Sequence, residues 1–110
     1  MQYIPKQGDI VYLSFDPQKR REQKGRRPAL IVSNNEFYER TRMALVCPIT
    51  STVSDFPMHV MLDSRTATKG VIMCEQVKCL DISVRDAVYE EFVPDDIMDE
   101  VIDLMCSFIE

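Results

Sequence analysis

Short apolar segments separated by polar breaks run through the first 92 residues of the chain. The segment Asp9–Phe15 is rich in β-branched and aromatic residues and predicts a strand, which Asp16-Pro17 ends. A polar run up to Arg27 then predicts a long loop. The continuous apolar run Ala29–Val32 is typical of a strand buried on both of its faces. Because such burial exceeds what a small domain supplies, it also predicts a twofold interface between two copies.

The middle of the chain repeats this pattern of short strands. We expect a helical turn at Glu36–Thr41, a mobile loop at Thr50–Pro57 and a turn at Asp63–Gly70. Pro48 closes one predicted strand near its end, where a missing N–H is tolerated. The remaining strands are predicted at Met43–Ile49, Met58–Leu62, Val71–Cys74, Val77–Leu80 and Ala87–Phe92.

The last segment is the clearest element. Apolar side chains recur at helical spacing from Ile97 to Ile109, with acidic residues between them, and predict a helix that packs on the core. Pro94 and the acids Asp95 and Asp96 suit its first turn. Short strands followed by one terminal helix indicate an α+β fold, a small barrel-like antiparallel sheet in a single domain that spans residues 1–110.

Composition places the chain among ordinary globular domains. With 110 residues, 45% hydrophobic content and three glycines, it forms one core and falls outside the disordered and collagen-like classes. No apolar run reaches the roughly 18 residues needed to span a bilayer, and the first residues lack the apolar core of a signal peptide. We therefore expect a cytoplasmic protein with no membrane partner.

Four cysteines and one histidine give little support for a metal site. The cysteines at 47, 74, 79 and 106 are scattered in apolar surroundings without a C-x-x-C pair, and His59 stands alone in a predicted strand. We expect four reduced thiols buried as small apolar side chains, a structural histidine, no metal ligands and no cofactor.

The net charge of −5 argues against a generic nucleic-acid binder, but the charges are unevenly placed. Six of the thirteen basic residues fall between positions 19 and 27, whereas nine acids and no base lie between Asp86 and Glu110. A short basic loop is what a phosphate-contacting site requires, because local potential governs capture more than net charge does. A solvated surface loop is the alternative interpretation.

Two segments carry candidate chemistry. Arg27 stands where the basic loop enters a buried strand, and Pro28 restricts the backbone there, so the guanidinium is held in place to fork onto a phosphate. Pairing with a nearby acid such as Glu22 explains the same pattern equally well. Thr50 ends a strand and can donate its hydroxyl to a phosphate oxygen, although a threonine there more often caps a turn.

Several short motifs follow one another in a distinctive order. They are Gly8-Asp9-Ile10-Val11, Phe15-Asp16-Pro17, the core from Glu22 to Ala29, Pro48-Ile49-Thr50, Phe56-Pro57 and Glu75-Gln76-Val77-Lys78. This order resembles the MazF/PemK family of toxin-antitoxin endoribonucleases over nearly the whole chain, weakening in the C-terminal helix. The resemblance implies an SH3-like antiparallel β-barrel of the plasmid-maintenance-toxin type, with five to seven strands and a C-terminal α-helix, and a symmetric homodimer.

The resemblance also implies an activity, which is sequence-selective cleavage of single-stranded RNA, and a partner, which is a MazE-like antitoxin protein that occupies the RNA groove. Arg27 stands at the position of the family's active-site arginine, and Thr50 stands at the position of its active-site threonine. Glu22 matches a loop glutamate implicated in activity, and Gln76 matches a glutamine near bound RNA. Further RNA contacts are expected at Lys19, Arg20, Arg21, Lys24, Arg26 and Lys78. Arg20 and Arg21 stand where the family usually has Gly and Ser, which makes this loop more basic than usual.

We hypothesise that the substrate's 2′-hydroxyl attacks its own 3′-phosphate without a metal ion, with Arg27 and Thr50 binding the developing charge and Glu22 accepting the proton. Two other classes of function remain open. One is a non-enzymatic gyrase poison of the CcdB type with the same fold, although this chain lacks the tryptophan on which such poisons depend. The other is a binding module whose basic loop captures an acidic protein tail.

Overall fold

A computed structural model describes residues 2–15 and 25–110 of the chain. Within these ranges, no helix is long and apolar enough to cross a membrane. In chain order the elements are β1 (Asp9–Ser14), β2 (Arg26–Ile31), α1 (Asn35–Thr41), β3 (Ala44–Thr50), β4 (His59–Met61), β5 (Val71–Met73), the 3-10 turn η3 (Cys74–Gln76), β6 (Lys78–Leu80), the 3-10 turn η4 (Ile82–Val84), β7 (Val88–Phe92) and α2 (Asp95–Ser107).

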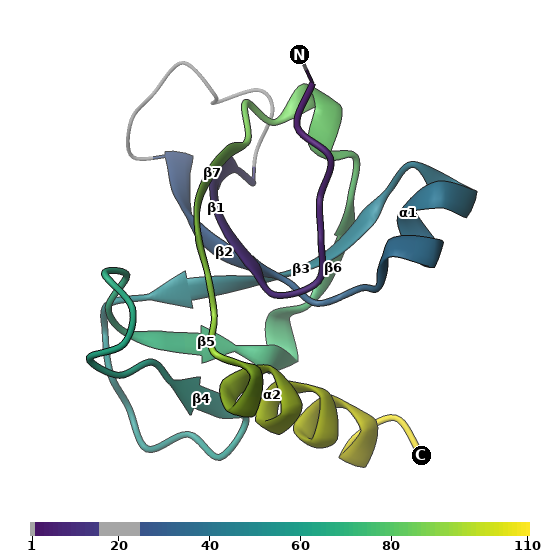
Figure 1. Cartoon of the computed structure of the whole chain (residues 1–110). Coiled ribbons are helices and arrows are strands. Elements are labelled where there is room, and N and C mark those ends of the chain that lie inside the picture. The colour runs from purple at the N-terminus through teal and green to yellow at the C-terminus, as the bar shows by residue number, and fades with distance from the viewer. Residues whose placement is uncertain (1, 16–24) are drawn as a thin grey trace.

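The strands in this part of the chain form a seven-stranded antiparallel sheet in the order β4-β5-β3-β2-β1-β7, with β6 also paired to β3. β3 is the central strand. One of its edges pairs with β2, and the other pairs with β6 at Ala44–Val46 and with β5 at Ile49–Thr50. Figure 1 shows β3 crossing the middle of the molecule, with α2 lying along the side formed by β4 and β5. The predicted α+β fold with an antiparallel, barrel-like sheet is confirmed.

Pro48 does not close its strand, contrary to our prediction, because β3 continues through it to Thr50. On one edge Pro48 lies opposite Ala29 of β2. On the other edge the pairing with β6 covers Ala44–Val46, and the pairing with β5 covers Ile49–Thr50. On that edge Pro48 therefore lies between the residues paired with β6 and those paired with β5, a break in the pairing where a residue without an N–H is tolerated.

Both faces of the central strands are buried within a single copy of the chain. On one face Leu30 and Ile49 belong to a core cluster that α2 completes, and on the other face Ile31 and Val46 belong to a cluster that β6 and η4 complete. The predicted burial of Ala29–Val32 on both faces is confirmed, whereas the first residues of β2, which include the exposed Arg27, are not buried. The argument that a second copy must supply this burial is wrong, because the chain's own later segments supply it.

The C-terminal helix α2 begins after Pro94, with Asp95 and Asp96 in its first turn, as the sequence predicts. Acidic side chains there interact favourably with the positive end of the helix dipole. The helix turns its apolar stripe onto the core, and it ends at Ser107 rather than continuing to Ile109. Its fully or nearly buried residues are Ile97, Met98 and Val101.

The four thiols do not share one environment. Cys47 and Cys74 are buried, but Cys79 and Cys106 are exposed, so the prediction of four buried cysteines is wrong for two of them. Cys106 is exposed near the end of α2. Within residues 2–15 and 25–110, no three His, Cys, Asp or Glu side chains gather into a group that could hold a metal ion.

Candidate active site

Arg27 and Thr50 lie at the same end of two neighbouring strands. β2 and β3 are antiparallel, with Ile31 opposite Val46 and Ala29 opposite Pro48. Carried two residues further along both strands, this register brings Arg27 opposite Thr50. Two residues that are 23 positions apart in sequence are therefore adjacent in the sheet.

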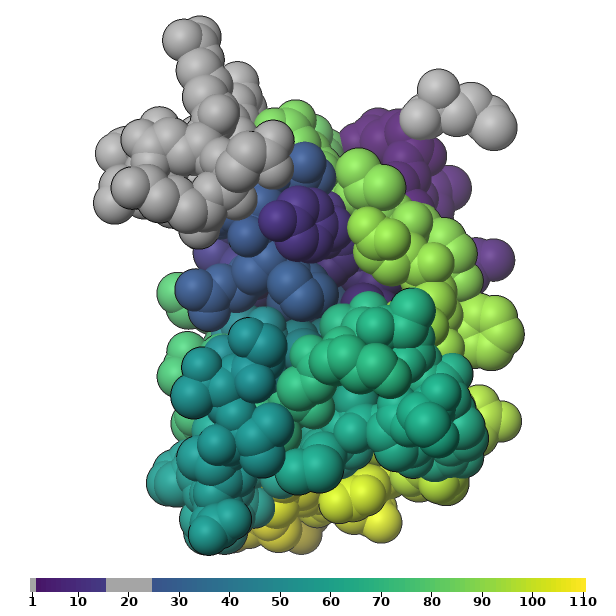
Figure 2. Space-filling view, turned by 90° about the vertical axis from the view of Figure 1, so that its left-hand side faces the viewer, coloured from purple at the N-terminus to yellow at the C-terminus, as the bar shows by residue number. Residues whose placement is uncertain are grey.

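A concave site of about 250 Å³ opens where these strand ends meet the turn before β5. It brings together three residues that the sequence singled out, namely Arg26, Arg27 and Thr50. Figure 2 shows this side of the molecule, with the start of β2 (blue) next to the teal and green segments that follow β3 and precede β5. The complete lining is Arg26, Arg27, Pro28, Ile49, Thr50, Ser51 and Lys69.

The two arginines of the site differ in their contacts. The Arg26 guanidinium lies over the Tyr12 ring, 4.8 Å from its centroid, and donates hydrogen bonds to the carbonyl oxygens of Tyr12 and Asp86. Arg27 is exposed, and in the described ranges it forms no ion pair. Arg26 thus contributes to the protein's own structure, whereas Arg27 is exposed at the concave site.

The Thr50 hydroxyl has one role within the protein and one left for a ligand. Its oxygen accepts a hydrogen bond from the backbone N–H of Thr52 at 3.2 Å, which is the turn-capping contact that we gave as the alternative. A hydroxyl can accept and donate at once, so this contact leaves the proton for a second partner. The cap fixes the oxygen beside Arg27 and does not compete with binding.

Sequence reasoning missed Lys69 and Gly70, which come from the turn before β5. Lys69 lines the site, and its ammonium donates to the Thr66 carbonyl at 3.0 Å. Gly70 has a φ of +120°, and a Cβ atom there would lie 2.0 Å from the Thr50 carbonyl oxygen. A Lys-Gly pair directly before a predicted strand was the available signal, but nothing in the sequence links that strand to Thr50.

Gln76 and Lys78 lie along β3 from the site rather than in it. Lys78 is exposed and pairs with Val46, four residues before Thr50, which corresponds to about 13 Å along an extended strand. Gln76 is exposed at the end of η3. Neither residue lines the concave site, so an RNA strand has to extend beyond that site to contact them.

His59 connects the segment after Thr50 to η3. Its Nδ1 lies 3.4 Å from the Ser54 hydroxyl, and its Nε2 lies 3.3 Å from a Glu75 carboxylate oxygen. The Phe56 ring packs edge-on against the imidazole, with 5.1 Å between centroids. These contacts give His59 the structural position expected of it, and they tie the loop beyond Thr50 to the turn that carries Gln76.

Five of the predicted site residues lie outside the described residues. One is Glu22, the expected proton acceptor, and the others are the expected RNA contacts of the basic loop. These are Lys19, Arg20, Arg21 and Lys24. Among the described residues, the charged side chains that line the concave site are Arg26, Arg27 and Lys69.

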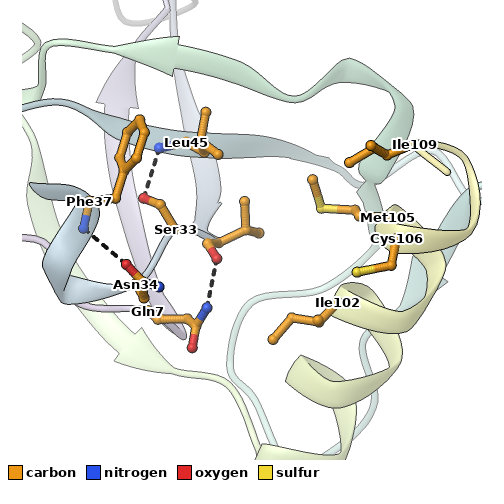
Figure 3. A pocket seen from close by; sticks show the side chains of 10 residues that line it. Gln7, Ser33, Asn34, Phe37, Leu45, Ile102, Met105, Cys106 and Ile109 are labelled. Atoms are coloured by element: carbon orange, nitrogen blue, oxygen red, sulfur yellow. Dashed lines mark hydrogen bonds between the residues drawn. The ribbon is translucent and has the colours of Figure 1, made fainter. Parts of the chain in front are cut away.

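A second concave surface, of about 270 Å³, lies between α1 and α2 and is unsuited to phosphate chemistry. Figure 3 shows Phe37 facing Ile102 and Met105 across it. Its polar groups are already engaged, since Gln7 donates to the Val32 carbonyl and the Ser33 hydroxyl accepts from Leu45 N–H. None of the described residues that line this surface has a charged side chain.

Comparison with known proteins agrees with the fold and with the order of the motifs. The family model described as PemK-like, MazF-like toxin of type II toxin-antitoxin system matches residues 6–109. The endoribonuclease toxin MazF of Escherichia coli K12 is 35% identical over 85 residues, which cover 77% of this chain and 76% of that protein. The endoribonuclease PemK of Escherichia coli is 35% identical over 106 residues, covering 93% and 80%.

Solved structures extend the comparison to three dimensions. A crystal structure of MazF from Deinococcus radiodurans has a TM-score of 0.85 and 33% identity, covering 98% of both chains. A MazE-MazF crystal structure from the same organism has a TM-score of 0.83 and 30% identity, covering 98% of this chain and 97% of that one. The chain therefore belongs to the family of PemK-like, MazF-like toxins of type II toxin-antitoxin systems, whose relatives named above are endoribonucleases.

Proposed function

We propose that this toxin is an endoribonuclease that cuts single-stranded RNA by transesterification at the site of Arg27 and Thr50. The observation that carries the proposal is the convergence of an exposed guanidinium and an available hydroxyl at one concave site. A planar guanidinium can fork onto two phosphate oxygens, and a hydroxyl can donate to a third acceptor on the same group. The site thus suits a phosphodiester.

In the proposed reaction the substrate's 2′-oxygen forms a bond to the adjacent phosphorus, and the bond from phosphorus to the 5′-oxygen breaks. The products are a 2′,3′-cyclic phosphate and a 5′-hydroxyl end. Negative charge grows on the phosphorane oxygens in the transition state, and Arg27 and Thr50 bind that charge more tightly than they bind the substrate. Loss of one such donor costs about two to three orders of magnitude in rate.

The two proton transfers need partners besides Arg27. The 2′-hydroxyl loses a proton to a base, and the departing 5′-oxygen gains one. Arginine is a poor base because its pKa exceeds about 12. We assign the first transfer to Glu22, as the resemblance implies, when the loop brings its carboxylate to the 2′-hydroxyl. Because positively charged side chains neutralise the phosphate in this scheme, it requires no metal ion.

The nucleophile determines which nucleic acid is a substrate. DNA of the same sequence binds without being cut, because it lacks the 2′-hydroxyl. A duplex resists the in-line arrangement of nucleophile and leaving group, whereas an unpaired strand allows it and exposes its bases for recognition. A single 2′-deoxy substitution at the cut position abolishes cleavage if the mechanism is right, and cleavage despite it refutes the mechanism.

The proposal includes two protein partners. We assign the chain a homodimeric state and a MazE-like antitoxin that covers the RNA-binding surface, in keeping with the similarity to the MazE-MazF structure. Exposed apolar side chains, among them Phe92 at 70% exposure and Ile109 at 74%, are consistent with surfaces that another chain covers. A monomeric mass at micromolar concentration by light scattering would count against the dimer.

The decisive experiment incubates the purified protein with a long single-stranded RNA in EDTA and maps the ends. Discrete cuts with 5′-hydroxyl ends, lost in Arg27→Ala, are the expected result. Arg40→Ala is the matched control, because Arg40 is an exposed arginine on α1 that pairs with Glu36 of the same helix. Intact RNA with wild type would refute the enzyme proposal, and a gyrase-DNA cleavage assay would then test the alternative of a gyrase poison.

A further inference from the structure

The turn Asp63–Gly70, between β4 and β5, is held by a carboxylate from a distant strand. Glu91 of β7 accepts hydrogen bonds from the backbone N–H groups of Ala67 at 3.1 Å and Thr68 at 2.8 Å, and from the Thr68 hydroxyl at 2.8 Å. Hydrogen bonds to a charged acceptor are about twice as strong as neutral ones. The Glu91 carboxylate therefore fixes the turn at its middle.

Other contacts make the turn rigid around this point. Thr66 is 2% exposed, and its hydroxyl donates to the Thr68 carbonyl at 2.8 Å. Arg65 forks onto Asp63 within the turn and onto Asp96 at the start of α2. Glu91 and Arg65 thus both anchor the turn, and the residues that Glu91 contacts, Ala67 and Thr68, lie nearer to the end of the turn than Arg65 does.

The end of the turn enters the proposed active site. Gly70 lies so close to the backbone of Thr50 that a Cβ atom there would overlap the Thr50 carbonyl, and Val71 pairs directly with Thr50. Lys69, one residue earlier, lines the same concave site as Arg27. The position of the Lys69 side chain relative to Thr50 therefore depends on the conformation of the turn.

The Lys69 ammonium has capacity for a ligand. One of its three N–H donors is used on the Thr66 carbonyl. Asp63 and Glu91 are near enough for the lysine's charge to help lower their pKa values, but their oxygens accept from Arg65 and from the turn's backbone. No ion pair joins Lys69 to either carboxylate in the described part of the chain.

We infer that Lys69 binds a phosphate of the RNA substrate, and that Glu91 is a positioning residue that holds Lys69 in place through the turn. This inference rests on the proposed function, because it names a further binding group and a support for the same site. Lys69 acts as a point charge on a backbone phosphate rather than on the reacting atoms. It therefore strengthens the binding of substrate and transition state alike.

Uniform binding of this kind predicts a specific kinetic pattern. Lys69→Gln raises KM about tenfold and leaves kcat within about twofold, because a charge-assisted hydrogen bond contributes similarly before and during the reaction. Lys69→Arg keeps the positive charge, and its KM stays close to that of wild type. Lys6→Gln is the matched control, since Lys6 is an exposed lysine outside the site. Equal KM values for Lys69→Gln and Lys6→Gln would overturn the inference.

A binding measurement provides an independent readout. The probe is a single-stranded oligoribonucleotide that contains a mapped cut site with a 2′-deoxy substitution at the cut position. Each phosphate neutralised on a single strand contributes about 0.7 to the slope of log affinity against log salt concentration. Lys69→Gln is expected to reduce this slope by about that amount, and an unchanged slope would contradict a phosphate contact.

A double-variant cycle tests the role of Glu91. Glu91→Gln keeps the side chain's size and raises KM, with the exposed neighbour Glu90→Gln as control. If Glu91 acts through Lys69, the double variant Lys69→Gln/Glu91→Gln has the same KM as Lys69→Gln alone. If the increases in KM of the two single variants multiply in the double variant, Glu91 acts independently of Lys69. Wild type that fails to cut RNA would refute the proposed function itself, whereas unchanged KM values in a wild type that cuts would refute this inference alone.

Discussion

The guanidinium of Arg26 lies over the ring of Tyr12, and the neighbouring Arg27 is exposed at the concave site that Thr50 also lines. The two arginines are consecutive in a strand, so their side chains point to opposite faces of the sheet. One face offers an aromatic ring and two carbonyl oxygens, and the other opens beside Thr50. The two arginines therefore have different roles, and substitution should separate them.

Arg26→Ala is expected to lower the free energy of unfolding by about 2 kcal/mol, because it removes a cation–π contact and hydrogen bonds from a charged donor. Arg27→Ala should leave stability within about 0.5 kcal/mol, since it removes an exposed side chain that forms no ion pair with the residues the structure describes. Urea unfolding of both variants measures the difference. Equal stabilities would contradict the structural role of Arg26.

Thr50→Val should lower kcat about a hundredfold, because the substituted side chain has nearly the same shape but cannot donate to a phosphate oxygen. Thr50→Ser keeps the hydroxyl and the hydrogen bond from Thr52 N–H, and it should retain most of the activity. Single-turnover cleavage of a defined oligoribonucleotide gives the rates. An active Thr50→Val variant would exclude the hydroxyl from the chemical step.

Gly70→Ala should destabilise the protein by at least about 2 kcal/mol, because the backbone is left-handed there and the added Cβ atom would lie 2.0 Å from the Thr50 carbonyl oxygen. Gly8→Ala is the matched control. Gly8 also has a positive φ, of +96°, but an added Cβ atom would come no closer than 4.0 Å to a neighbour. Chemical denaturation measures the free energy of unfolding of both variants. Gly8→Ala adds backbone strain alone, whereas Gly70→Ala adds strain and steric overlap with Thr50. Equal losses of stability would show that the overlap with Thr50 is easily relieved.

The ion pairs of Arg65 should give the protein's stability a pH dependence in acid. Hydrogen bonds from Arg65 lower the pKa of Asp63 from 3.8 to about 2, and they lower the pKa of Asp96 as well. Both groups have depressed pKa values in the folded state, so their contribution is present above about pH 4 and is lost as the pH falls through 2.

Thermal unfolding of wild type and Arg65→Gln across this pH range tests the assignment. The difference in melting temperature should be constant at neutral pH and should close between about pH 4 and 2, because protonated carboxyl groups no longer favour the arginine. Arg40→Gln, which removes an exposed local pair on α1, serves as the control. A difference that persists unchanged at pH 2 would mean that Arg65 stabilises the turn by packing rather than by charge.

The positions of the helices and strands could be predicted because the pattern of apolar and polar residues within a segment depends mainly on that segment's own secondary structure. β-Branched and aromatic residues located β1, a continuous apolar run located β2, and the helical spacing after Pro94 located α2. Strand ends were less accurate. β2 begins at Arg26, three residues before the apolar run, because pairing with β1 extends the ladder over charged side chains. No local property of Arg26 or Arg27 signals this partner.

The candidate site was predictable only where a motif marked it. Arg27 and Thr50 belong to motifs with a recognisable order, and the register of β2 and β3 then places them side by side. Lys69 and Glu91 belong to no motif, and 22 residues separate them in sequence. They are connected because Glu91 of β7 binds the turn that carries Lys69, and this tertiary contact cannot be predicted from residue spacing.

The position of β7 at the end of the sheet also affects the protein's behaviour in concentrated solution. An edge strand leaves one row of backbone N–H and C=O groups open to pairing with another molecule, and β7 adds exposed apolar side chains such as Phe92. Glu90 and Glu91 place two negative charges in this strand and oppose stacking of one copy on the next. Variants that neutralise either glutamate should therefore aggregate at lower concentrations than wild type, and their kinetics are best measured in dilute solution.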